Sequence, residues 1–307
     1  MKQVIPKQSA KLIEIAEFYL NSEAFKRLKR KTQRDYESHL KAIVNTVVEG
    51  KALGVYHNKN IKVRHLTAAY ELWVKSGVRS ANYRKTILSA CWKHSMRYDV
   101  MVHNPVSLVK TQKTDRRTVM WTREYVKRFL DEAYSDFNYR SIGLIVHMAY
   151  QWGQRVGDMR LLKWEALDLT ECRLDIRQSK RGAEVHLPIS KNLCQMLQAQ
   201  QKDFGFQEFV APRVKPRSGA FTPYDLEEIS PNINMLLDKA NLPRELTAMD
   251  LRRTAVTEML EAGVDIAGIR QVTGHKNMNS VVPYMVNTFS GASKALSARG
   301  NEDESEK

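Results

Sequence analysis

The fold is decided by residues 141–164, which read SIGLIVHMAYQWGQRVGDMRLLKW. This stretch opens with an apolar run, Ser141–Trp152, that is shorter than the ~20 residues needed to cross a membrane. The run therefore predicts a helix buried in a protein core. Two glycines, Gly153 and Gly157, then flank Arg155. An arginine between glycines, directly behind a buried helix, favours a role in binding or catalysis over a role as a surface helix cap.

Two later segments also place basic side chains beside apolar helices. Asp250-Leu-Arg252-Arg253-Thr254 opens a helical pattern, in which Arg253 competes with Arg252 for the same role. Thr273-Gly274-His275-Lys276 is followed, nine residues after the histidine, by Tyr284. Cations near a side-chain nucleophile are what phosphoryl transfer without a metal requires.

Other chemistries find less support. The acidic residues form no tight cluster in an apolar context, as two divalent metals would need, so we expect no metal site and no cofactor. A serine-hydrolase elbow and a phosphate-binding glycine loop are also absent from the sequence. Three cysteines in apolar settings are typical of buried thiols in a reducing cytoplasm. With no signal peptide and no membrane span in the sequence, we expect a cytoplasmic protein in a bacterial or phage-infected cell.

Positive charge is concentrated near the N-terminus. The net charge is +15, and residues 1–118 hold 24 basic against 9 acidic side chains, so this part alone carries the whole excess. Such asymmetry indicates a polyanionic partner, because lysines and arginines that neutralise phosphates release bound counterions. The alternative is a solubilising basic face with no partner.

The length of 307 residues and the shifts in composition predict two domains. Helical patterns cover Thr32–Val48, a segment capped by Thr67 that ends near Gly77, and Ser80–Tyr98. In the second part, Leu174–Gln178 and Glu184–Pro188 alternate as two strands of a hairpin around Lys180-Arg181-Gly182. The predicted organisation is a basic bundle of four short helices (1–110), a linker (111–118), a mainly α domain with a small β-hairpin (119–297) and an acidic, disordered tail (298–307).

Taken together, these motifs resemble the tyrosine recombinase, or phage integrase, family of site-specific recombinases. Arg155 matches the first arginine of the family's Arg-(Ile/Val)-Gly-(Glu/Asp) motif, and Asp158 matches its acidic residue. Arg252 matches the arginine of His-x-Leu-Arg, His275 the histidine of Leu-Gly-His, and Tyr284 the tyrosine nine residues later. In the same way Lys180 matches the lysine of the hairpin turn, with Arg181 as the alternative.

The resemblance implies a role for each of these residues. Tyr284 would attack the scissile phosphate, Arg155, Arg252 and His275 would bind its oxygens, and Lys180 would protonate the leaving oxygen. Asp158 would orient an arginine or the backbone. The fold implied is a clamp of two domains, a helical core-binding domain and a catalytic domain, closed around DNA.

One position departs from the family pattern. Met249 stands where the family has the histidine of His-x-Leu-Arg, and a methionine can neither donate a proton nor bind phosphate. Three interpretations stay open: the histidine assists without being essential, the enzyme is slow, or the enzyme has lost activity.

The function that the resemblance implies is cutting and rejoining of double-stranded DNA at specific sites. The reaction would pass through a 3′-phosphotyrosine and a Holliday junction held by a homotetramer, in phage or mobile-element integration and excision, with accessory DNA-bending proteins as possible partners. The alternatives are a DNA-binding relative that has lost catalysis and a recombinase that resolves chromosome dimers.

Overall fold

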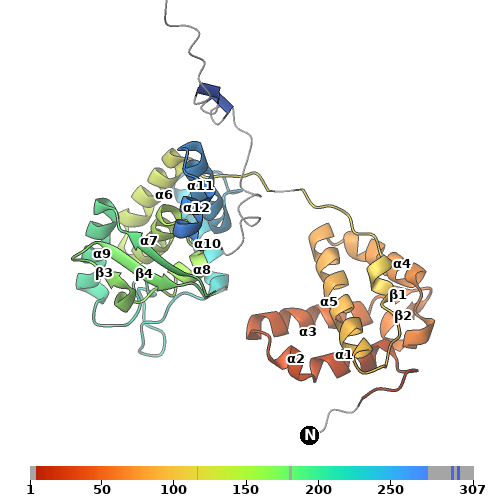
Figure 1. The fold of residues 1–307 in the computed structure, drawn as a ribbon. Coiled ribbons are helices and arrows are strands. Elements are labelled where there is room, and N and C mark those ends of the chain that lie inside the picture. Colours follow the sequence, from red (N-terminus) through yellow and green to blue (C-terminus); the bar gives the residue numbers. More distant parts are fainter. Residues whose placement is uncertain (1–4, 116, 180–181, 276–291, 294–295, 298–307) are drawn as a thin grey trace, which may run out of the picture. The chain divides into compact units, whose positions relative to one another are not determined.

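The computed structural model describes residues 5–115, 117–179, 182–275, 292–293 and 296–297. The chain divides into two compact units, Met1–Arg117 and Thr118–Lys307, each with its own hydrophobic core. Both units are mainly helical and each contains a small antiparallel sheet, which confirms the predicted fold class (Figure 1). Among the described residues, no helix is long and apolar enough to span a membrane.

The first unit is a bundle of helices. Its core is formed by apolar side chains from all four of its longer helices, with Leu12, Ile43, Ala69 and Trp92 fully or almost fully buried. The elements in chain order are α1 (Leu12–Leu20), α2 (Glu23–Lys26), α3 (Arg30–Val44), β1 (Val47–Val48), β2 (Lys51–Ala52), the 3₁₀ turns η1 (Leu53–Val55) and η2 (Asn58–Asn60), α4 (Val63–Val74), α5 (Val78–Met96) and η3 (Pro105–Leu108).

Several helix ends in this unit differ from the sequence prediction: α3 begins at Arg30 and not at Thr32, and α5 runs over Val78–Met96 and not over Ser80–Tyr98. Two further differences have a local cause. The helix predicted to reach Val48 ends at Val44, because Glu49 and Gly50, both at positive φ (51° and 76°), form a tight turn that pairs β1 with β2. Thr67 was predicted as a helix cap but lies inside α4. The cap is Lys62, whose backbone N–H donates to Nδ1 of His65 (3.1 Å), so a histidine takes the place of the glutamate or glutamine that usually accepts this bond in a capping box.

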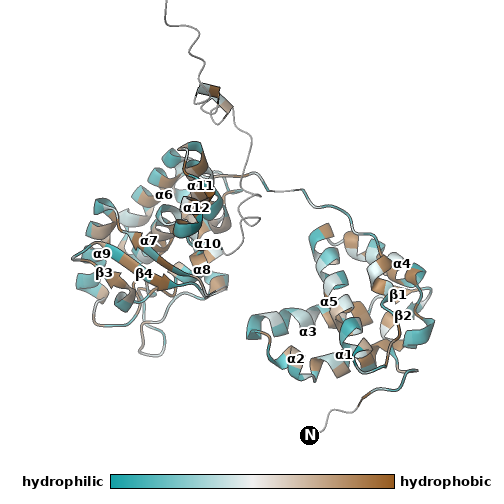
Figure 2. Ribbon diagram, viewed as in Figure 1, coloured by the Kyte–Doolittle hydropathy of each residue, from teal (hydrophilic) through white to brown (hydrophobic). Residues whose placement is uncertain are grey.

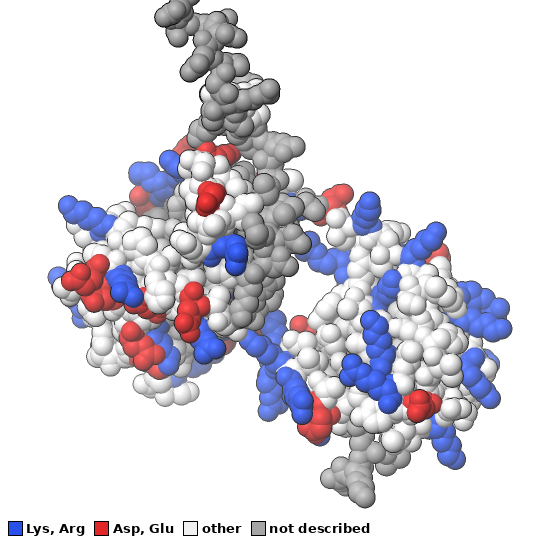
Figure 3. Space-filling model, in the orientation of Figure 1, with Lys and Arg blue, Asp and Glu red and all other residues white. Residues whose placement is uncertain are grey.

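The surface of the first unit is strongly basic. Figure 3 shows many lysines and arginines and few acidic side chains on the visible face of this unit. Exposed basic residues such as Arg30 and Lys31 lie on α3, and Lys93 lies on α5. This arrangement follows from the amphipathic helices, which bury their apolar stripes and turn their charged faces outward.

The second unit is built around one central helix. The elements in chain order are α6 (Arg123–Ser135), α7 (Phe137–Gln151), α8 (Val156–Met159), the 3₁₀ turn η4 (Trp164–Ala166), β3 (Leu167–Asp168), β4 (Arg173–Arg177), β5 (Glu184–Pro188), α9 (Lys191–Phe204), α10 (Leu226–Lys239), α11 (Ala248–Glu261) and α12 (Ile266–Thr273). Residues 141–149 of α7 are all buried, and α7 packs against α6, α9, α10 and α11. A helical stretch buried on every side needs an apolar sequence all round, and residues 141–149 are apolar apart from Ser141 and His147. Most other helices mix hydrophilic and hydrophobic residues (Figure 2).

The predicted hairpin is confirmed. β4 pairs antiparallel with β5 in the register Arg177↔Glu184, and β3 adds a third strand on the other side of β4. The backbone N–H of Gln178 donates to the Ala183 carbonyl (2.8 Å), and the N–H of Gly182 donates to the Gln178 carbonyl (2.9 Å). These two hydrogen bonds close the turn that contains Lys180, which itself lies outside the described residues.

The cysteines are free thiols, as expected, but two of them are neighbours in space. The Sγ atoms of Cys172 and Cys194 lie 2.7 Å apart, although 22 residues separate them in sequence. Burial raises the pKa of Cys194 to about 11, and the hydrogen bond to Cys172 adds to this effect. Cys91 is buried in the core of the first unit, which also raises its pKa.

Candidate active site

The Arg155 loop begins where the central helix ends. Trp152 is buried, and its indole N–H donates to the Pro188 carbonyl (3.1 Å), which joins the end of α7 to the end of β5. Gly153 follows in the left-handed region (φ 56°), so the chain can turn there without strain. Arg155 then stands at the N-cap position of α8, and its side chain is 25% exposed.

Arg155 lies between a glutamine and a carboxylate. Its Nη1 donates to Oε1 of Gln178 (2.9 Å) and lies 3.7 Å from Oδ2 of Asp158. The other carboxylate oxygen of Asp158 accepts from the Ser179 backbone N–H (3.2 Å) and from the Ser179 hydroxyl. Asp158 therefore connects α8 to the hairpin turn and faces the arginine, the contacts expected of an orienting group.

Arg252 is the buried arginine of α11. Its Nη1 donates to the Gly153 carbonyl (3.0 Å) and its Nη2 to the Thr273 carbonyl (2.8 Å), while Arg253 is less buried. The helix start is fixed by Thr247 and Asp250, which exchange hydrogen bonds as a capping box. Arg252, and not Arg253, is therefore the arginine of this helix that contacts the loop carrying Arg155.

His275 completes the cluster. Its Nε2 lies 3.1 Å from Nη2 of Arg252, and its Nδ1 lies 2.6 Å from the Thr273 hydroxyl. That hydroxyl donates its single hydrogen to the Ile269 carbonyl (2.6 Å), so it accepts from Nδ1–H and leaves the Nε2 lone pair toward Arg252. The backbone of His275 is held by Nε of Arg270, which donates to its carbonyl (3.0 Å).

The structure therefore brings together Arg155, Asp158, Arg252 and His275, which come from three separate segments of the sequence. Lys180 and Tyr284 lie outside the described residues. Met249 is 86% exposed on the first turn of α11, and the hydrogen bonds of Arg252 to the Gly153 and Thr273 carbonyls do not involve it. An open hollow of about 390 Å³ adjoins the cluster, lined by Ala183, Ala267, Arg270, Gln271, Gly274 and His275.

Two buried glutamines at this site were missed by the sequence analysis. Gln178 and Gln154 are each 1% exposed; Gln178 accepts a hydrogen bond from Arg155, and Gln154 accepts one from Gln178. Each stands next to or two residues from a predicted site residue, Arg155 or Lys180. Position alone does not show that an amide is buried, so only the long-range contacts identify them.

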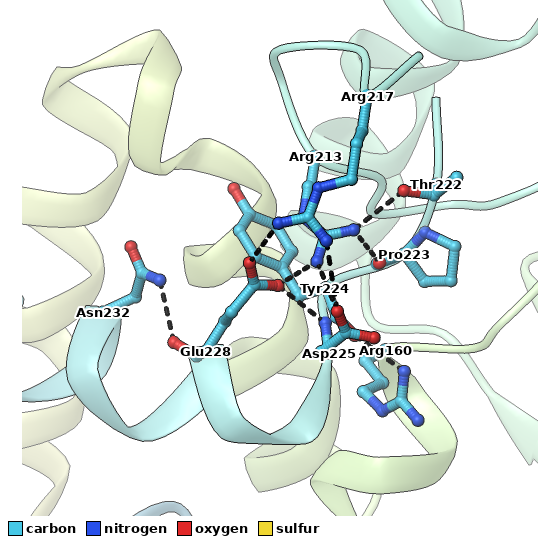
Figure 4. A network of polar contacts seen from close by, with 9 residues as sticks. All are labelled: Arg160, Arg213, Arg217, Thr222, Pro223, Tyr224, Asp225, Glu228 and Asn232. Carbon is cyan, nitrogen blue, oxygen red and sulfur yellow. Dashed lines mark hydrogen bonds and ion pairs between the residues drawn. The ribbon is translucent and has the colours of Figure 1, made fainter. Parts of the chain in front are cut away.

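An ionic network lies between the end of α8 and the start of α10. Arg160, just after α8, donates to the Tyr224 carbonyl (2.6 Å). Arg213 donates to Asp225 (2.9 Å) and contacts Glu228, and both acids lie at the start of α10. Figure 4 shows the network, which also includes Arg217, Thr222 and Pro223. Because Arg213 and Arg217 are paired with Asp225 and Glu228, the network anchors the loop before α10, and Arg160 joins that loop to the end of α8.

No group of three histidine, cysteine, aspartate or glutamate residues in the described part of the chain is placed to hold a metal ion.

Comparison with known proteins gives consistent matches. The model of the phage integrase family matches residues 119–290. The tyrosine recombinase XerC of Anoxybacillus flavithermus is 22% identical over 224 residues, covering 68% of this chain and 72% of the relative. The integrase of Enterobacteria phage 434 is 26% identical over 163 residues, but the match spans only 52% of this chain and 43% of that integrase.

Solved structures match the fold over almost the whole chain. A lambda integrase dimer bound to a COC′ core site has a TM-score of 0.74 at 20% identity, covering 97% of this chain and 81% of that chain. The Tn1549 transposon integrase has a TM-score of 0.73 at 16% identity, covering 94% of this chain and all of the matched chain. The family model covers more than half of the chain, and the predicted resemblance is confirmed: this protein belongs to the phage integrase family of tyrosine recombinases.

Proposed function

We propose that this recombinase cuts and rejoins duplex DNA through a covalent bond between Tyr284 and a 3′ phosphate. The observation that carries the proposal is the cluster of Arg155, Arg252 and His275 within one unit. Arg252 contacts His275 directly, and Gln178 links Arg155 to the Thr273 carbonyl that Arg252 also binds. Two guanidinium groups beside an imidazole form a site suited to a phosphate and to the extra charge of its transition state.

The chemical step is a transesterification. The Tyr284 hydroxyl loses its proton to solvent as its oxygen attacks phosphorus, the bond from phosphorus to the 5′ oxygen breaks, and the phosphate at the 3′ end of the cut strand stays attached to the enzyme. Lys180 delivers the proton that the departing 5′ oxygen takes up, and Arg155, Arg252 and His275 hold the nonbridging oxygens. One phosphoester replaces another, so the bond energy is kept for the rejoining step and no external energy source is required.

The partner proposed is double-stranded DNA with specific recombination sites. The net charge of +15 lies entirely in residues 1–118, which fits a first unit that supplies much of the affinity for the phosphate backbone. A lambda integrase tetramer has been solved bound to a Holliday junction, and this chain matches it with a TM-score of 0.72. We accordingly propose a homotetramer that acts on two sites, in the cytoplasm, in phage or mobile-element integration and excision, with DNA-bending accessory proteins.

The second candidate role is resolution of chromosome dimers. The match to XerC favours it, because that match covers more of both chains than the match to the phage 434 integrase. Recombination between two identical directly repeated sites, with no exchange between unlike sites, would support this role over integration.

The test of the chemistry is a nicked duplex that traps the covalent intermediate. Wild-type protein should give a protein–DNA adduct on a denaturing gel, also in EDTA, and Tyr284→Phe should give none while still binding DNA. Tyr139→Phe is a matched control, since it also removes one phenolic oxygen, which makes a weak hydrogen bond to the sulfur of Met235 (3.6 Å). An adduct from the Tyr284→Phe variant, or no adduct from the wild type, would contradict the proposal and favour a relative without catalysis.

A further inference from the structure

Two buried glutamine side chains connect the segments of the candidate site. Gln154 immediately precedes Arg155, and Gln178 follows β4 at the start of the hairpin turn. Both side chains meet the turn at the end of α12, where Thr273 precedes the glycine and histidine. Each glutamine is 1% exposed, so each amide must find its hydrogen-bond partners inside the protein.

The hydrogen bonds of the pair form one continuous chain. Oε1 of Gln178 accepts from Nη1 of Arg155 (2.9 Å), and its Nε2 donates to Oε1 of Gln154 (2.6 Å) and to the Thr273 carbonyl (2.7 Å). Nε2 of Gln154 in turn donates to the carbonyls of Trp152 (3.0 Å) and Val272 (2.6 Å). All four amide hydrogens and both amide oxygens are used.

This pattern allows a single orientation of each amide. If the amide of Gln178 were reversed, its NH₂ group would face the guanidinium of Arg155 and its oxygen would face the Thr273 carbonyl. If the amide of Gln154 were reversed, its oxygen would face two backbone carbonyls. The acceptor that Arg155 uses is therefore fixed in place from the side opposite the arginine.

Close packing adds to this constraint. A Cβ atom at Gly274 would lie 2.7 Å from Nε2 of Gln178, so the turn before His275 approaches the amide as closely as a glycine allows. The hairpin turn, in contrast, is closed by the backbone of Gln178 and not by its side chain. Replacing the side chain thus removes the support of Arg155 while the turn keeps its own hydrogen bonds.

We propose that Gln178, held by Gln154, is a positioning residue that orients the guanidinium of Arg155 for strand cleavage. The proposal rests on the function proposed above for Arg155. Neither glutamine is proposed to touch DNA. An arginine near a reacting phosphate helps only when its N–H groups already point at the transition-state oxygens, and a misplacement of about 1 Å can cost ~10²-fold in rate.

The test compares Gln178→Met and Gln154→Met with a matched control, Gln200→Met, in the full-length protein. Gln200 is also fully buried in the second unit, accepts from Nε of Arg140 (2.7 Å) and donates to the Val210 carbonyl (3.1 Å), but it is not part of the cluster. Methionine keeps the length of the side chain and removes its amide.

The first measurement is the rate of adduct formation on a nicked duplex at saturating DNA. Gln178→Met and Gln154→Met should be slower than wild type by ~10- to 100-fold, with unchanged DNA affinity, while Gln200→Met should cleave at the wild-type rate. In an Arg155→Ala background, Gln178→Met should cost less than about twofold, because the group it orients is gone. A Gln178→Met variant as fast as the control, or an undiminished effect without Arg155, would overturn the proposal.

The second measurement does not depend on activity. In protein labelled with ¹⁵N-arginine and free of DNA, the Nη–H signal of Arg155 should be present in wild type and in Gln200→Met, and lost in Gln178→Met. An unchanged Arg155 signal in Gln178→Met would overturn the positioning role, whatever the adduct assay shows. Absence of an adduct from wild-type protein, with the expected change in the Arg155 signal, would contradict the proposed function alone and support the positioning role.

Discussion

Gly274 offers a sharp test of how tightly the candidate site is packed. It caps α12 in the left-handed conformation (φ 66°, ψ 29°), and a Cβ there would lie 2.7 Å from Nε2 and 3.0 Å from Cδ of Gln178. These atoms belong to a buried amide held by three hydrogen bonds. The amide cannot yield to the new methyl group without breaking them, so Gly274→Ala should do more than strain the backbone.

Gly263 separates the two effects. It also follows a helix of the same unit at positive φ (85°), but a Cβ there would meet nothing within 4 Å. Gly263→Ala should therefore cost only the left-handed conformation, ~1–2 kcal/mol of unfolding free energy. Gly274→Ala should cost this amount plus the three disturbed hydrogen bonds, each worth ~0.5–1.5 kcal/mol, which gives a total of roughly 2.5–6.5 kcal/mol.

The assay is urea unfolding of both full-length variants, followed by adduct formation at a temperature where each is folded. Gly263→Ala should cleave at the wild-type rate, while Gly274→Ala should be slow because Gln178 no longer holds Arg155. Equal losses of stability in the two variants would refute the packing argument. A wild-type cleavage rate in Gly274→Ala would refute the link from this turn to the arginine.

Three further predictions address other parts of the molecule. Burial lowers the pKa of His147, whose Nδ1 lies 2.9 Å from the Tyr134 hydroxyl, to about 4. The imidazole of the unfolded chain titrates near its ordinary pKa, so it takes up a proton at a higher pH than the folded one does. The free energy of unfolding should therefore be at its full value above pH ~6.5 and fall by about 3 kcal/mol as the pH falls toward 4. Urea unfolding against pH should show this loss in wild type but not in His147→Gln, and identical curves for the two proteins would contradict the prediction. Met249→His should leave adduct formation intact or make it faster, because the position is 86% exposed and histidine is the residue that the family has there. A loss beyond the tenfold that ~1.4 kcal/mol represents, in a variant that folds and binds DNA, would show that this position requires methionine. Isolated residues 1–118 should bind duplex DNA with a steep dependence on salt and residues 119–307 should bind weakly, whereas equal affinities at low salt would contradict this division.

Local patterns in the sequence predicted much of the second unit. The helix over Ile266–Thr273 has local signals at both ends, because Asp265 caps it at one end and Gly274 at the other. The alternation around the hairpin turn predicts β5 with its observed ends and β4 one residue later than observed. The apolar run of α7 identifies the centre of the core. These signals come from neighbours along the chain, so one sequence is enough to read them.

The composition of the site depended on the tertiary structure. The spacing of the motifs favoured Arg252 over Arg253, but only the packing of α11 against α7 shows which guanidinium reaches the Gly153 carbonyl, 99 residues away in sequence. The glutamine bridge joins Gln178 to Thr273 across 95 residues. An amide in a sequence is as compatible with solvent as with a core, and its role is decided only when folding removes water and leaves it a fixed set of partners.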